Sequence, residues 1–121
     1  MPGEIINSKR FFQFWSYSVS HSELLFRSTK SPESPTRIDV FFKGVKEVHL
    51  PTTSTGLRIT EASDADIGRL CTLRKSPSFG KDVKFFTVQG ADFVGYIAAL
   101  IALCHEDGGE YYEPSFFAPQ K

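Results

Sequence analysis

Cysteine and methionine are scarce in this sequence of 121 residues. It has one methionine and two cysteines, Cys71 and Cys104, and neither cysteine belongs to a Cys-x-x-Cys pair. Paired-cysteine zinc motifs are therefore absent, and we expect no metal site. In a chain without a secretion signal, two cysteines are more often buried thiols than a disulfide. We therefore expect both thiols to be free and buried.

Signals for secretion, membrane insertion and catalysis are missing as well. The longest apolar run, FVGYIAALIALC at residues 93–104, is shorter than the roughly 20 residues that a membrane-spanning helix needs. Residues 1–10 contain no signal-peptide core. No Walker loop, dinucleotide-binding glycine loop, G-x-S-x-G or H-E-x-x-H motif occurs. We expect a cytoplasmic protein with no membrane partner and no cofactor, and the sequence names no catalytic residue.

The charge balance argues against another class of partner. The 14 basic and 14 acidic residues give a formal net charge of zero. Basic side chains in the first half of the chain are dispersed among Glu23, Asp39 and Glu47 rather than gathered in one run. A domain that binds nucleic acid normally carries a clear basic excess, so we expect no nucleic-acid partner.

Phenylalanine, in contrast, is abundant, and the stretch RFFQFWSYS at residues 10–18 has aromatic side chains at both odd and even positions. A strand with one solvent-exposed face alternates apolar and polar residues. The odd positions are expected to face the core. On the even face Phe12 and Phe14 then need a cover, either from this chain or from a second subunit or partner. We therefore predict a partner-binding surface at Phe12, Phe14, Trp15 and Tyr17.

Alternating apolar runs between breakers predict a mainly β chain. The first nine residues are expected to be loose, and Gly44 either bends a long strand or separates two strands. The run 93–106 is apolar on all sides, so it is a helix or a strand, and the tight turn before it favours the strand. Strands are expected at residues 10–19, 22–29, 37–50, 57–59, 83–89, 93–106 and 110–117.

One helix is predicted at residues 63–75. Ser63 and Asp66 resemble a capping box, apolar side chains recur at helical spacing, and Pro77 ends the pattern. The predicted fold is therefore a single β-rich domain over residues 1–121, of the α+β class. It has an antiparallel meander sheet of about six to eight strands, open or curled toward a barrel, and this one helix.

Three residues are candidates for a polar site. His21 and Glu23 lie in and just after the turn that follows the aromatic strand, where they can form an acid–base pair. A histidine in a turn more often binds local backbone groups. Asp39 lies on the polar side of its strand, where it forms either a weak surface pair with Arg37 or, if that side lines a pocket, a buried carboxylate.

Residues 11–60 carry a resemblance to known proteins. The segments SHSELLFRS, IDVFFKGVKEVHLP and GLRI resemble small bacterial proteins of unknown function and, more loosely, antiparallel-sheet immunity proteins that neutralise contact-delivered toxins. Those proteins similarly have an early His-acidic turn before a strand, then a Phe-x-Gly-Val run. Here Ser22 and Glu23 follow His21, where the resemblance would place an Asp directly after the histidine. The resemblance implies a non-enzymatic protein that binds another protein, and no catalytic residues.

Two functional classes remain. The first is a non-enzymatic protein-binding module of bacterial type, immunity-like or homodimeric, that acts through its aromatic strand surface. The second is a small-ligand-binding or enzymatic β domain with an aromatic pocket. A packed interior with a flat aromatic surface would favour the first class, and a deep pocket with converging Asp, His or Tyr side chains would favour the second.

Overall fold

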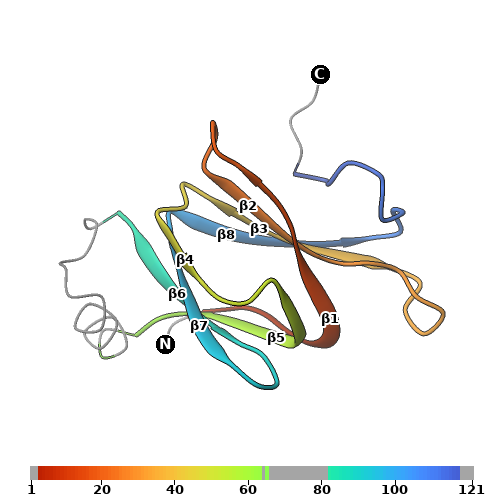
Figure 1. The fold of residues 1–121 in the computed structure, drawn as a ribbon, viewed down its shortest axis with the longest axis horizontal. Coiled ribbons are helices and arrows are strands. Elements are labelled where there is room, and N and C mark those ends of the chain that lie inside the picture. The colour runs from red at the N-terminus through yellow and green to blue at the C-terminus, as the bar shows by residue number, and fades with distance from the viewer. Residues whose placement is uncertain (1–2, 64, 66–81, 118–121) are drawn as a thin grey trace.

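The computed structural model describes residues 3–63, 65 and 82–117, which form one eight-stranded sheet (Figure 1). The strands are β1 (Glu4–Ser18), β2 (Glu23–Ser28), β3 (Arg37–Lys43), β4 (Glu47–His49), β5 (Thr53–Glu61), β6 (Lys84–Gln89), β7 (Val94–Ala99) and β8 (Ile101–Asp107). The helix predicted at residues 63–75 falls almost wholly outside the described residues. Within residues 3–63 and 82–117 there is no helix.

All strand pairings are antiparallel, and the strand order is β4-β7-β6-β5-β1-β2-β3-β8. Two three-stranded meanders, β1-β2-β3 and β5-β6-β7, are joined by the pairing of β1 with β5. The prediction of a mainly antiparallel sheet is therefore confirmed, but the order is not that of one continuous meander. The sheet ends at β4 and β8 and is not closed into a barrel.

The sheet bends sharply where β3 passes into β4 and β7 passes into β8. Two backbone hydrogen bonds cross the bend, from Lys46 N to the Ala98 carbonyl (2.7 Å) and from Leu100 N to the Lys43 carbonyl (3.0 Å). Gly44 makes the bend with a φ of 64°, and a Cβ there would lie 2.5 Å from Cγ of Leu100. Only glycine adopts this conformation without strain and leaves this space. Of the two alternatives for residues 37–50, the structure therefore shows two strands, β3 and β4, separated at Gly44.

The core lies between the two halves of the bent sheet and is built largely from phenylalanine. Aromatic rings meet edge to face across it, with centroids 5.6 Å apart for Phe14 and Phe26 and 5.7 Å for Phe42 and Phe86. Such edge-to-face pairs add to the hydrophobic contribution of the buried area. The fully enclosed side chains come from both meanders: Phe12, Leu24, Phe26, Val40, Phe42, Leu57, Ile59, Phe86, Val88 and Ile97.

The prediction that the odd positions of the first strand face the core is wrong. Phe12 is 0% exposed and Phe14 packs against the core, whereas Phe11 is 50% exposed. The strand has an irregularity between Phe14, which pairs with Phe26, and Ser16, which pairs with Leu25, so Trp15 is an extra residue. A one-residue bulge reverses which parity faces inward. Aromatic residues occur on both parities because one set fills the interior and the other lies outside it.

The structure resolves one ambiguous segment and corrects two others. Residues 93–106 form strands β7 and β8, as preferred over a helix, and Gly90 N donates to the Phe93 carbonyl (3.1 Å) in the turn before them. The first nine residues are not loose, because β1 begins at Glu4 and pairs with β5. Residues 110–117 are not a returning strand but a series of turns. Within the described part of the chain, no helix combines the length and apolar character needed to cross a membrane.

The expectation of a buried thiol is wrong for Cys104, which is free and exposed on β8. This strand lies at the end of the sheet and has a neighbour on one side only, so its side chains are less covered than those of inner strands. Partial burial, together with the charges of Glu106 and Asp39, raises the pKa of the thiol above its ordinary value of 9.0. Cys71 lies outside the described residues.

Replacement of Phe12 by alanine should lower the free energy of unfolding by roughly 3–5 kcal/mol, because it leaves a cavity between the two halves of the sheet. Phe11→Ala is the matched control on the same strand and should cost less than about 1 kcal/mol. Urea unfolding followed by circular dichroism measures both values. Equal, small losses for the two variants would contradict the interior placement of Phe12.

Candidate functional site

The segment after β8, residues 108–117, turns back (Figure 1), and its backbone contacts side chains on the outer face of β2 and β3. Two arginines on that face hold its backbone. Arg37 donates to the carbonyls of Glu110 (3.0 Å), Glu113 (2.8 Å) and Pro114 (3.2 Å). Arg27 donates to the carbonyl of Tyr111 at 2.8 Å. The position of this segment therefore depends on side chains of β2 and β3.

Each arginine also pairs with a carboxylate on the neighbouring strand. Arg27 lies directly opposite Asp39 in the β2–β3 register and binds it through two hydrogen bonds of 2.7 and 3.1 Å. Both residues are almost fully buried, at 2% and 1% exposed. Asp39 is therefore a buried carboxylate paired with Arg27, and the expected surface pair with Arg37 is not what forms. Among the described residues, no buried side-chain nitrogen or oxygen lacks a hydrogen-bond partner.

Arg37 forms the equivalent pair with Asp107, its partner in the β3–β8 register. The two hydrogen bonds measure 3.1 and 3.0 Å. The hydrogen bonds from Arg37 lower the pKa of the Asp107 carboxyl below its ordinary value of 3.8. The same contact raises the pKa of Arg37.

Aromatic stacking fixes the far end of the segment. The ring of Phe117 stacks on Phe41 of β3 with centroids 5.1 Å apart, and Phe116 stacks on His105 of β8 at 3.9 Å. Both contacts are nearly parallel, with interplanar angles of 8° and 15°. Residues 108–117 thus cover the outer face of β3 and the His105–Asp107 end of β8, whereas Ile101 and Leu103 of β8 stay exposed. The part of the outer face toward β1 is also left open.

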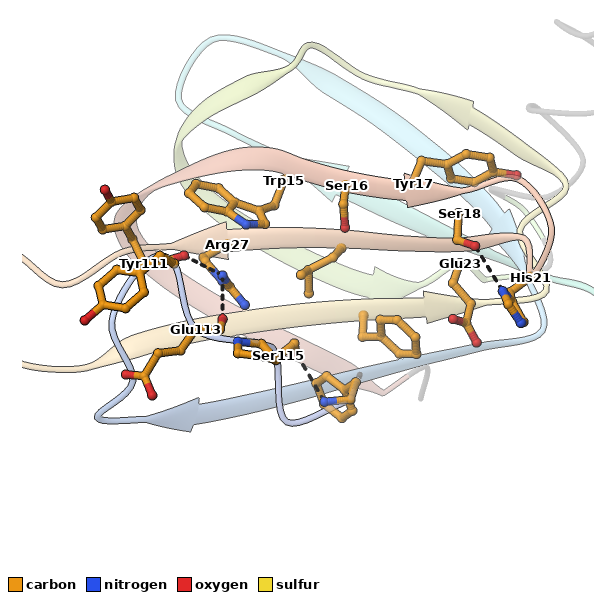
Figure 2. Close-up of a pocket in the computed structure, with 15 residues that line it drawn as sticks. Trp15, Ser16, Tyr17, Ser18, His21, Glu23, Arg27, Tyr111, Glu113 and Ser115 are labelled. Carbon is orange, nitrogen blue, oxygen red and sulfur yellow. Dashed lines mark hydrogen bonds between the residues drawn. The ribbon is translucent and has the colours of Figure 1, made fainter. Parts of the chain in front are cut away.

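A groove of about 660 Å³ occupies this open part, between the β1–β2 hairpin and the C-terminal segment (Figure 2). Its floor is formed by Leu25, Arg27 and Phe41, and its walls by β1 on one side and residues 111–117 on the other. Figure 2 shows Trp15 and Tyr111 toward one end and Tyr17, Glu23 and His21 toward the other. The groove is therefore rich in aromatic and hydroxyl-bearing side chains: Trp15, Ser16, Tyr17, Ser18, Tyr111, Tyr112 and Ser115.

The charged groups in the groove are few. The guanidinium of Arg27 lies 5.1 Å from the ring centre of Trp15 and is neutralised by Asp39 below it. His21 Nδ1 lies 3.1 Å from both the Ser18 and the Ser20 hydroxyl oxygens. The carboxylate of Glu23 has no hydrogen-bond or ion-pair partner among the described residues. His21 and Glu23 share the groove, but they do not form the hydrogen-bonded pair that an acid–base dyad requires.

The structure brings together some of the predicted site residues and separates others. Trp15, Tyr17, His21 and Glu23 all line the groove. Asp39 lies beneath it and reaches it only through Arg27. Phe12 and Phe14 lie on the interior face of the sheet, so they do not contribute to this surface.

Sequence reasoning missed Arg27, Arg37 and the tyrosine pair Tyr111 and Tyr112. The sequence did hold a sign that the arginines are buried. Each lies on the same outward-facing side of its strand as a buried apolar residue, Leu25 on β2 and Phe41 on β3. This signal identifies the partners of the arginines only when the strand register is known, and the sequence does not reveal the register. In the described part of the chain, no group of three or more His, Cys, Asp or Glu side chains could hold a metal ion.

Removal of the Asp39 carboxylate should leave the charge of Arg27 buried without a partner. We expect Asp39→Ala to lower the free energy of unfolding by roughly 3–5 kcal/mol in urea titrations, as for other buried pairs that lose one partner. The double variant Arg27→Met/Asp39→Leu is the control and should lose less than Asp39→Ala, because it leaves no unpaired charge. A larger loss in the double variant would contradict this account of the pair.

The Arg37–Asp107 pair predicts a dependence of stability on pH. Because the folded state lowers the pKa of Asp107, the carboxylate stabilises the fold above the pKa of the unfolded state, and this contribution is lost as pH falls through the folded value. Asp107→Asn should therefore be less stable than the native chain at neutral pH, and the gap should narrow below about pH 4. Glu33→Gln, which removes a carboxylate without an ion-pair partner among the described residues, should show no such narrowing.

Comparisons with known proteins identify no relative of this chain. No protein-family model matches it, and no curated protein and no solved structure matches it either. A function for the chain therefore rests on the groove and its chemistry.

Proposed function

We propose that this chain is a non-enzymatic protein-binding module whose aromatic groove holds a segment of a partner protein. The observation that carries the proposal is the cluster of exposed tyrosines around an apolar floor. Tyr111 is 59% and Tyr112 is 71% exposed, while Leu25 and Phe41 below are buried. Tyrosine and tryptophan dominate the binding energy of many protein interfaces, since they combine a large apolar surface with a hydrogen-bonding group.

The shape of the groove also suits a chain segment. Along β2 it extends from Glu23 to Arg27, about 13 Å at about 3.3 Å per residue, the length of four or five residues in an extended conformation. Serine hydroxyls of Ser16 and Ser18 on one wall can bind backbone groups of such a segment. An immunity-like role, in which the partner is a contact-delivered toxin, is one specific form of this proposal, and the resemblance of residues 11–60 supports it.

A small-molecule site is the second candidate, because a volume of about 660 Å³ falls within the range of ligand pockets, about 300–1,000 Å³. The polar groups of the groove argue against an enzyme that acts on a small molecule bound there. Asp39 is committed to Arg27, and His21 is hydrogen-bonded to serines in its own turn. Neither is placed to transfer a proton to a bound molecule.

Selection of a phage-displayed random peptide library on the folded protein tests the proposal. Peptides that bind the groove should lose roughly thirtyfold in affinity on Tyr17→Ala or Tyr112→Ala, since truncation of an interface anchor costs about 2 kcal/mol or more. The control Phe11→Ala removes an exposed aromatic ring of β1 outside the groove and should leave affinity unchanged. Peptides that bind all variants equally, or a library that yields no binder, would overturn the proposal.

Sedimentation of the native chain distinguishes a foreign partner from a second copy. We expect a monomer at high concentration. A dimer that Tyr17→Ala dissociates would place another copy of this chain in the groove instead.

A further inference from the structure

The charges of the groove are unbalanced once internal pairs are removed. The charge of Arg27 is neutralised by Asp39, to which it donates two hydrogen bonds. Lys30, which lies beside Trp15 and Tyr111 on the adjoining surface, is paired with Glu110 at 2.5 Å and does not line the groove. The carboxylates of Glu23 and Glu113 line the groove without forming an ion pair among the described residues, and Arg37 acts on Glu113 only at longer range. An occupant that leaves them unpaired would have to desolvate two negative charges.

The two carboxylates differ in how available they are. Glu113 is exposed, and its Oε1 already accepts a hydrogen bond from Glu110 N at 2.8 Å. Glu23 is half-buried at the opposite end of the groove and has no such partner among the described residues (Figure 2). A partly desolvated carboxylate interacts more strongly with a cation than an exposed one does. Glu23 is therefore the stronger attachment point.

Aromatic rings around the groove favour the same kind of charge. The guanidinium of Arg27 over Trp15, at 5.1 Å, is an internal example of a cation on an aromatic face. The rings of Tyr17, Tyr111 and Tyr112 are exposed. Tyr17 lies toward the same end of the groove as Glu23, whereas Tyr111 lies toward the other end (Figure 2). Tyrosine faces attract a cation within about 6 Å of the ring centre, and arginine most often of the natural side chains.

We infer that the groove selects a partner segment that presents an arginine to Glu23, with its guanidinium beside the ring of Tyr17 at the same end of the groove (Figure 2). This inference rests on the proposed function and names the chemistry of the partner. The planar guanidinium can bind a carboxylate through two hydrogen bonds while its face packs on a ring, which a lysine ammonium cannot do. A neutral or acidic segment would lack the compensating charge.

The test compares one selected peptide with its analogue in which the arginine is replaced by citrulline, a neutral side chain of nearly the same shape. Trp15 is the single tryptophan of the chain and lines the groove, so its fluorescence reports binding directly. We expect the native protein to bind the citrulline peptide roughly tenfold more weakly, a loss in the range of a charge-assisted hydrogen bond at a half-buried site. The variant Glu23→Gln should bind both peptides with equal affinity.

Matched controls distinguish a failure of the arginine inference from a failure of the proposed protein-binding function. Glu33→Gln removes a carboxylate on the exposed loop outside the groove and should preserve the tenfold difference. If binders are neutral or acidic, or if Glu23→Gln keeps the difference, the arginine inference fails, and loss of binding on Tyr17→Ala would still support the proposed function. If Tyr17→Ala has no effect, the proposed function fails and the inference fails with it. Thermal melts should show that Glu23→Gln folds like the native chain.

Discussion

The two buried arginines of the outer face connect the sheet to the segment that follows it. Arg27 and Arg37 each bind a carboxylate on the neighbouring strand and at least one carbonyl of residues 110–114. Residues 110–114 form no strand, so their backbone carbonyls lack the partners that a sheet would provide. The arginines donate hydrogen bonds to these carbonyls instead. The carboxylates in turn neutralise charges that would be costly to bury alone. One wall of the groove exists because this network holds the segment in place.

The bulge at Trp15 determines which side chains of β1 form the opposite wall of the groove. Before it, the inward-facing aromatic residues are Phe12 and Phe14, which fill the core. After it, Ser16 and Ser18 lie opposite Leu25 and Glu23 on the outer face and line the groove together with Trp15 and Tyr17. Without the extra residue, Ser16 and Ser18 would share the inward parity of Phe12 and Phe14. This stretch therefore contributes to two surfaces, the interior of the sheet and the groove.

These two features combine in a groove that is apolar below, aromatic along its sides and acidic at its ends. The interior of the sheet is separately packed with phenylalanine, so the groove is not needed to complete the core. A surface of this kind suits recognition of an extended segment better than chemistry on a small molecule, because its polar groups are dispersed along its length. The charge that remains after internal pairing favours a cationic partner.

The sequence by itself determined the mainly β character of the chain, because alternation and breakers are local signals. The β1–β2 hairpin, an interruption at Gly44 and the strand character of residues 93–106 could be predicted in this way, whereas the start of β1 at Glu4 and the end of strand structure at Asp107 could not. Trp15, Tyr17, His21 and Glu23 were recognised as candidates, but not as neighbours of Tyr111 and Tyr112. Only the tertiary structure decided which face of β1 is inside, since side-chain direction has a period of two and one extra residue reverses it. It also decided the arginine contacts, which join residues 12, 70 and 84 positions apart. Such pairs follow from strand register and chain reversal, and no local pattern encodes either.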